Sequence, residues 1–271
     1  MKRVLLLSGI LALGVVGCKK ASPTAFIKAI SMYLNDYDGQ QTSLHRFYLL
    51  TTSPNYKPTI MFNNRTVPDD RIDASLGDYT GWDTLPSVSP NTEVELKVTY
   101  YNLNDEKKEA SSKVKLPAEP AGMALSISGG EVNVSWNKPD KATTDFVYVG
   151  IYAGCTDGSS TQYAFVDTVI TDIENVTSVS RTLGSICDEI SNILAASVYA
   201  GVYNMKGPWS ASKDNVKGAK GQYYGGAGKA DTTSYMPTKG NYNLSIPEVD
   251  WSSRILNALG GPVDGGEWIE R

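Results

Sequence analysis

The chain has 271 residues, a formal net charge of −4 and 41% hydrophobic residues, which is the composition of a folded globular protein. A weakly acidic chain in which lysine and arginine do not cluster argues against nucleic acid as a partner. The length is generous for one domain and accommodates two domains of about 100 residues each, followed by a tail.

Residues 1–17 have the layout of a secretory signal peptide. Lys2 and Arg3 supply a positive start, and the uncharged segment 4–17 follows. This segment is shorter than the roughly 20 residues that a membrane-spanning helix needs. The alternative is an ordinary signal peptide that happens to contain a cysteine.

The small residues before Cys18 resemble the lipobox of bacterial lipoproteins. In that family a peptidase cuts before the cysteine, which then carries acyl chains, so the resemblance implies that Cys18 is the lipid anchor and residues 18–24 are its tether. Lys19 stands where some lipoproteins carry the acidic residue that retains them on the inner membrane. By this analogy we expect a location in the bacterial cell envelope, at the outer membrane.

Residues 25–117 predict antiparallel β structure, with short alternating segments between clusters of Gly, Pro, Asn and Asp. In the clearest strand, Val94, Leu96, Val98 and Tyr100 share one face, and charged or polar residues occupy the other. We interpret this region as a divergent β-sandwich. The two prolines in residues 118–122 indicate a semi-rigid linker to the next domain.

Residues 123–218 predict about seven short strands, which is typical of a second sandwich. The segment 132–136, ending in Trp136, and the segment 198–204 resemble the second and sixth strands of a fibronectin type III domain. The resemblance covers residues 120–218 and implies that Trp136 fills the space between two sheets. The predicted fold class is therefore all-β, with two tandem immunoglobulin-like or fibronectin type III-like β-sandwiches.

Cys155 and Cys187 remain as a pair in an exported chain, which favours a disulfide between them. The usual fibronectin type III pattern lacks this pair. Two buried free thiols are the alternative, because sequence does not give the geometry of the pair.

Residues 219–271 predict a flexible, Gly/Tyr-rich C-terminal tail that contains one short amphipathic helix. Asp250 is the expected helix cap, and Trp251, Ile255, Leu256 and Leu259 form the apolar stripe. A helix this short needs a surface to pack on. That surface is either the chain's own sandwich or a partner, with Trp251 as the contact.

The motifs searched for catalysis do not support an enzyme. His45 is the one histidine and has no nucleophile or orienting group beside it in sequence. Ser210 and Lys213 match S-x-x-K by spacing without the companion motifs of that enzyme class. The Asp-rich segments 35–39 and 69–73 offer oxygen ligands for calcium, but turn chemistry explains them as well. We therefore expect no catalytic residue, no metal site and no cofactor.

The phasing of residues 198–203 predicts one more surface. If Val198 and Val202 face the core, Tyr199 and Tyr203 face outward and offer an aromatic binding patch. If Val147, Val149 and Ile151 also point inward, Phe146, Tyr148 and Tyr152 join that patch. The opposite register, with buried tyrosines on the third strand, remains open.

These observations predict a lipid-anchored envelope protein that acts as a non-enzymatic adhesion or scaffolding module. Its partners would be the membrane, through lipidated Cys18, and an envelope protein. The alternative is a surface glycan-binding lipoprotein. An enzyme that uses two carboxylates converging in one cleft is a third hypothesis.

Overall fold

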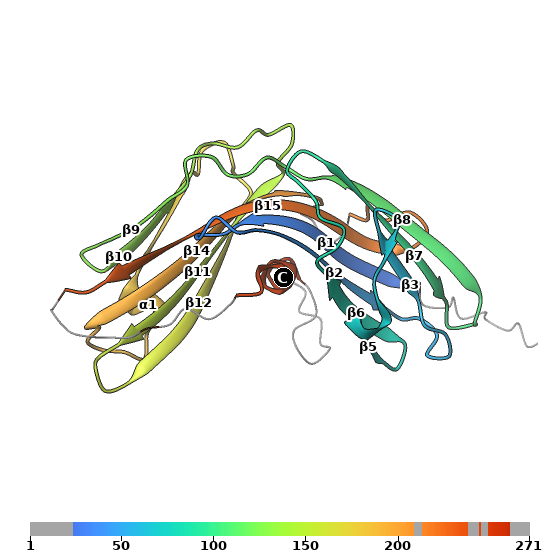
Figure 1. Ribbon diagram of the computed structural model, residues 1–271, viewed down its shortest axis with the longest axis horizontal. Helices are drawn as coiled ribbons and strands as arrows, with labels where there is room; N and C mark the ends of the chain where they lie inside the picture. The colour runs from blue at the N-terminus through green and yellow to red at the C-terminus, as the bar shows by residue number, and fades with distance from the viewer. Residues whose placement is uncertain (1–23, 209–212, 238–243, 245–248, 261–271) are drawn as a thin grey trace, which may run out of the picture.

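The computed structural model describes residues 24–208, 213–237, 244 and 249–260. The all-β prediction is confirmed: strands β1 to β15 form three sheets (Figure 1). The strands are β1 (Phe26–Asn35), β2 (Gln41–Leu50), β3 (Thr59–Phe62), β4 (Arg65–Thr66), β5 (Ile72–Ser75), β6 (Asp78–Asp83), β7 (Glu93–Tyr101), β8 (Lys107–Lys115), β9 (Ala124–Ser128), β10 (Glu131–Ser135), β11 (Phe146–Thr156), β12 (Thr161–Ile170), β13 (Ser178–Thr182), β14 (Ala195–Lys206) and β15 (Lys220–Tyr235). The helical segments are η1 (Asp69–Arg71), α1 (Leu183–Ile186) and α2 (Trp251–Ala258).

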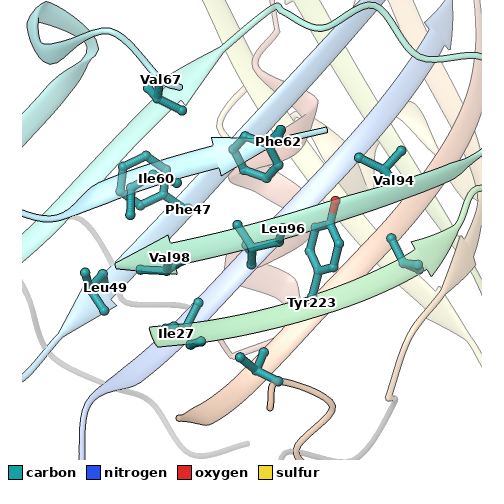
Figure 2. Packing of buried hydrophobic residues seen from close by; sticks show 14 of the residues in the cluster. Ile27, Phe47, Leu49, Ile60, Phe62, Val67, Val94, Leu96, Val98 and Tyr223 are labelled. Atoms are coloured by element: carbon teal, nitrogen blue, oxygen red, sulfur yellow. The ribbon is translucent and has the colours of Figure 1, made fainter. Parts of the chain in front are cut away.

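The N-terminal sandwich packs strands β1, β2, β6 and β5 against the sheet β4-β3-β7-β8. The alternation expected in residues 93–101 is confirmed, because Val94, Leu96, Val98 and Tyr100 are buried in β7. Figure 2 shows this core, in which side chains of β1, β2, β3 and β7 meet Tyr223 of β15. A residue about 200 positions downstream of β1 is thus part of the first core.

The C-terminal sandwich packs strands β12, β11, β14 and β15 against the sheet β13-β10-β9. Trp136 directly follows β10 and is buried between the sheets, as the fibronectin type III resemblance implied. Val147, Val149 and Ile151 of β11 and Val198 and Val202 of β14 face this core.

One continuous sheet joins the two sandwiches, in the strand order β12-β11-β14-β15-β1-β2-β6-β5. Strand β15 has 16 residues and pairs antiparallel with β14 on one side and parallel with β1 on the other. In Figure 1 the sheet bends into an arch, with a sandwich at each end and α2 under the middle. The expectation of a flexible tail from residue 219 onward is therefore wrong for residues 220–235, which form a central strand.

The glycines of β15 explain how so Gly-rich a segment becomes a strand. On the concave side of the arch, Gly226 and Gly228 lie opposite Met205 and Tyr203 of β14. A Cβ atom at Gly228 would stand 2.1 Å from Cδ1 of Tyr203, so any side chain there would collide with the ring. The small residues of β15 leave room for the large residues of its neighbour.

The last of the strands predicted within residues 123–218 would span residues 210–216, and the described residues do not confirm it. Residues 209–212 lie outside the described residues, and residues 213–216 are not in a strand. The sheet is instead completed by β15. Within the described ranges, none of the helices has the length and apolar character needed to cross a bilayer.

Candidate functional site

The tyrosines expected to form a binding patch lie on the concave face of the arch. Tyr199 and Tyr203 point away from the core of the C-terminal sandwich, together with Tyr148 of β11. The predicted phasing is thus correct, and the alternative register is excluded. The expected exposure is wrong, because Tyr199 and Tyr203 are only 4% and 0% exposed. Helix α2, on the concave side of the arch in Figure 1, covers this face.

Helix α2 docks on its own chain through Trp251. The indole lies against Gly150 of β11 and Gly201 of β14, which are cross-strand partners. A Cβ atom at Gly150 would stand 2.3 Å from Cζ3 of Trp251, so the glycine pair makes a flat slot for the ring. Trp251 Nε1 donates a hydrogen bond to the Tyr199 hydroxyl over 3.0 Å. Trp251 is therefore a buried anchor in the described conformation and not an exposed contact.

Both ends of α2 are held by cations of the N-terminal sandwich. The carboxylate of Asp250 caps the helix by accepting from Ser253 N, as predicted, and it also pairs with Arg46 of β2. At the other end, the Lys28 ammonium of β1 donates to the Leu259 carbonyl over 2.5 Å. A cation there also complements the helix dipole. Burial lowers the pKa of Lys28 to about 8.

A cleft of about 790 Å³ opens beside the N-terminus of α2. Its walls come from the turn between β1 and β2, the end of β6 and the first residues of α2. The volume is within the range of roughly 300–1,000 Å³ that small-molecule sites occupy. The lining residues include Asp36, Tyr37, Asp38, Gln40, Arg46 and Trp82.

Two exposed aromatic side chains line this cleft. Tyr37 is 56% exposed and packs edge-on against Tyr199, with the ring centroids 5.7 Å apart. Trp82 is 41% exposed, and the guanidinium of Arg71 lies over its ring at 4.3 Å from the centroid. Arg71 thus packs on the Trp82 ring, and part of the ring stays exposed in the cleft. Aromatic rings fixed in this way present apolar faces beside polar groups.

Polar groups with unused hydrogen-bonding capacity surround these rings. Asp36 accepts from Tyr37 N and from the Tyr199 hydroxyl through Oδ1 alone, at 2.7 and 2.9 Å. Asp38 accepts from Gln40 N through Oδ1 over 2.8 Å. Within the described residues, the Oδ2 atoms of both carboxylates make no hydrogen bond, and Arg46 Nε is buried without a partner. The cleft therefore offers carboxylate acceptors to a polar ligand.

The histidine considered for catalysis is a core residue. His45 is 0% exposed, and its Nδ1 and Nε2 atoms make hydrogen bonds with Ser31 Oγ and the Pro86 carbonyl. Burial lowers its pKa, which keeps the ring neutral. Both nitrogens are occupied inside the sandwich, so His45 does not reach a substrate.

The Asp-rich segments weighed for calcium form turns and a short helix. Asp36 and Asp38 make hydrogen bonds to backbone N–H groups in the β1–β2 turn, which is the turn chemistry named as the alternative. Asp69 begins the η1 segment. In the part of the chain that the structure describes, no group of three or more His, Cys, Asp or Glu residues is arranged to hold a metal ion.

The predicted disulfide between Cys155 and Cys187 is present, so the alternative of two free thiols is excluded. It ties the end of β11 to the residue that follows α1, inside the core of the C-terminal sandwich. The lipid-anchor candidate Cys18 and the S-x-x-K serine, Ser210, lie outside the described residues.

Trp82 and Arg46 are the site residues that sequence reasoning missed. They are cross-strand partners in β6 and β2, and their side chains share the concave face. In the sequence of segment 78–83, the polar Asp78 and Thr80 share one face of a strand with Trp82, and this pattern could have placed Trp82 on the solvent-facing side. Its pairing with Arg46 and its position near α2 depend on contacts between distant segments.

Comparisons with known proteins add little to the description of the fold. No protein-family model matches the sequence, and no curated protein matches it. Among solved structures, the fibronectin domains FN1–FN3 of chicken CNTN1 align at 13% identity with a TM-score of 0.26. The alignment covers 67% of this chain and 62% of that chain, so this chain spans less than two thirds of its neighbour. A TM-score this low supports no inference about function.

Proposed function

We propose that this protein is a lipid-anchored component of the bacterial cell envelope and acts as a non-enzymatic adhesion or scaffolding module. The observation that carries the proposal is the single eight-stranded sheet that runs through both sandwiches. Because β15 is hydrogen-bonded to both β1 and β14, the two sandwiches have a fixed relative orientation. A rigid spacer suits a protein that presents a binding surface at a set distance from its anchor.

The anchor rests on the signal-peptide pattern and on Cys18. Several acyl chains on one cysteine give stable membrane attachment, at about 0.8 kcal/mol per buried CH₂. We expect Cys18→Ser to abolish incorporation of radiolabelled palmitate and to move the protein from the outer-membrane fraction to the soluble fraction. Retention of both label and location in this variant would contradict the anchor.

The partner surface is expected at the end of the sheet formed by β12. Among the described residues this edge strand pairs with one strand, β11, so its other side can accept a strand from a partner. Tyr163 of β12 is 47% exposed and stacks on Tyr152, with ring centroids 6.0 Å apart. An exposed aromatic beside an open strand edge favours protein contact.

Co-purification from detergent-solubilised membranes tests this function. The full chain should retain a defined envelope protein, and Tyr163→Glu should reduce its yield at least severalfold. Leu85→Glu, at an exposed apolar residue outside β12, is the matched control and should have no effect. Failure of the intact chain to retain any envelope protein would contradict the scaffold.

Glycan binding is the second candidate, favoured by the cleft beside α2. Tyr37 and Trp82 supply faces on which sugar rings can stack, and Asp36 and Asp38 supply acceptors for sugar hydroxyls. The two carboxylates disfavour an acidic saccharide, so neutral oligosaccharides are the expected class.

An array of neutral, amino and acidic oligosaccharides, probed with the full chain, tests this candidate. Binding to neutral glycans should fall about tenfold in Trp82→Ala and in Tyr37→Ala and should persist in Tyr163→Ala. An array without any saturable signal, or equal losses in all three variants, would remove the glycan hypothesis.

A further inference from the structure

Three loops meet at one end of the N-terminal sandwich, and we call their exposed side chains Tyr56, Leu76 and Leu103 the loop tip. The chain after β2 ties these loops together. Thr52 N donates to the Gly77 carbonyl over 3.1 Å, and Ser53 N donates to the Tyr101 carbonyl over 2.8 Å. These bonds fix the β5–β6 turn and the end of β7 to one segment, so the loop tip is a defined surface.

The loop tip exposes apolar groups to solvent. Leu76 is 95% exposed, and Leu103 and Tyr56 are each 45% exposed. Leu76 also has a φ of 49°, a left-handed conformation that costs a non-glycine residue about 1–2 kcal/mol. A fully exposed leucine in a strained turn indicates a contact outside the described chain.

The loop tip lies at the end of the sandwich where β1 begins. Phe26, the first residue of β1, pairs with Leu50, and Leu49 pairs with Tyr79. The Leu76 turn therefore extends about two residues beyond the level of Phe26, two strand spacings or roughly 10 Å to the side. Seven peptide steps from Cys18 to Ala25 span at most about 25 Å. If Cys18 is anchored in a membrane, this short tether keeps the loop tip close to the membrane surface.

We propose that the loop tip rests in the interfacial layer of the bilayer that holds the acyl chains of Cys18. The inference depends on the lipid anchor proposed above and adds a second point of contact. An acyl anchor on a short tether leaves the arch free to tilt, whereas inserted leucines fix its orientation. Tyr56, stacked on Tyr101 with centroids 4.3 Å apart, suits the interface because its ring is apolar and its hydroxyl polar.

The contact is apolar in character. Asp105 is engaged by Ser53 and Asn55, and Asp78 accepts from Thr51 N over 2.9 Å, so the nearby carboxylates already have partners. Lys57, which follows Tyr56, is paired with Asp69 over 3.2 Å, so its charge is already partly compensated. Insertion should therefore be insensitive to ionic strength and should occur on zwitterionic lipid.

Depth measurements on the full chain in vesicles of phosphatidylethanolamine and phosphatidylcholine test the proposal. Leu76→Cys and Leu103→Cys would each carry a nitroxide label, with Tyr163→Cys and Leu85→Cys as matched controls at exposed apolar residues elsewhere. Cys155 and Cys187 are joined in a disulfide and do not react. The wild-type chain reports on Cys18, which takes up label only if it is not acylated.

We expect labels at positions 76 and 103 to collide at least severalfold more with oxygen than with an aqueous nickel chelate, and labels at 85 and 163 to show the reverse. This contrast should persist at high salt. Aqueous labels at 76 and 103 in a chain whose Cys18 is blocked would overturn the membrane contact alone and point to a protein partner. Labelling of wild-type Cys18 would overturn the anchor and the contact together.

Discussion

Ser31, His45 and Tyr223 form a hydrogen-bonded chain through the core of the N-terminal sandwich. Tyr223 Oη lies 2.6 Å from Ser31 Oγ, which lies 2.7 Å from His45 Nδ1, and His45 Nε2 lies 2.8 Å from the Pro86 carbonyl oxygen. A carbonyl only accepts, so Nε2 donates, and Nδ1 must accept from Ser31, which in turn accepts from Tyr223. All three hydrogen bonds can form only while the His45 ring is neutral, because a protonated Nδ1 cannot accept from Ser31.

The free energy of unfolding should therefore depend on pH through His45. Its pKa is lowered by burial, so the unfolded chain binds a proton more readily than the folded chain. The contribution of neutral His45 to the free energy of unfolding should be complete above the ordinary histidine pKa of about 6.5. It should decline as the pH falls below that value and be lost below the lowered pKa of the folded state. Urea denaturation between about pH 5 and pH 7.5 measures this.

His45→Gln is the control for this prediction, since the chain has one histidine. The variant should be less stable at neutral pH but should lose the pH dependence in this window. An unchanged pH dependence in the variant would assign it to other groups.

At the scale of elements, α2 bridges the two sandwiches. Trp251 occupies the slot at Gly150 and Gly201 of the C-terminal sandwich, while Arg46 and Lys28 of the N-terminal sandwich hold its ends. A helix of eight residues is marginal by itself in water, so its stability comes from this docking.

Gly150→Ala should weaken the docking of α2. The added methyl group would stand 2.3 Å from Trp251, and forcing extra volume into a packed site costs about 1–3 kcal/mol of folding free energy. We expect a red-shifted Trp fluorescence and faster proteolysis near α2. Gly184→Ala is the matched control, because a Cβ there meets nothing within 4 Å and lies in helix α1. Equal effects of the two substitutions would show that the slot is not tightly packed.

The disulfide also links separate elements, because it joins β11 to the residue after α1. Cys155 and Cys187 are separated by 32 residues, and closing a loop of this length stabilises a fold by about 3–4 kcal/mol in the chain-entropy model. The double variant Cys155→Ala/Cys187→Ala should lose about this much free energy of unfolding in urea. Reduction of the wild-type chain should give a similar loss. A loss well below 1 kcal/mol would mean that the core supplies the constraint without the bond.

The local sequence pattern predicts correctly those features that depend on residues close together in the sequence. The alternation of Val198 and Val202 with Tyr199 and Tyr203 correctly divided β14 between its two faces, and Asp250 was correctly identified as a helix cap. The exposure of those tyrosines was wrong because α2 covers them, and no local pattern reveals a cover about 50 residues downstream.

The central strand β15 was missed for a related reason. Glycine is depleted in strands, so a segment with Gly225, Gly226 and Gly228 predicts a loop by propensity. Here the glycines are required by Tyr203 and Met205 of β14, which occupy the space that side chains would fill. Propensity is overridden by packing, and the pairing partners are known only once the sheet is formed.

At the scale of the whole molecule, β15 makes the two sandwiches interdependent. Its first half supplies Tyr223 to the N-terminal core, and Tyr235 at its end packs on the C-terminal core. The same strand completes the backbone hydrogen bonding of β1 and of β14. Neither sandwich is complete without it.

A chain that ends at Val216 should therefore lose cooperative folding in both halves, because β1 and β14 become open edges and the first core loses Tyr223. A chain that ends at Pro237 keeps β15 and lacks α2, so it should fold with reduced stability. Differential scanning calorimetry of the three chains measures this, with one transition expected for the full chain. A cooperative transition in the chain ending at Val216 would show that β15 is dispensable.

The position of β15 also sets the order of events in biosynthesis. A nascent chain emerges N-terminus first, and β1 must wait for a parallel partner about 190 residues behind it. Both halves of the arch can collapse earlier, but neither can close its hydrogen-bonded sheet until residues 220–235 have been released. The final sheet therefore forms only after β15 has been synthesised, and until then both β1 and β14 lack a pairing partner on one side.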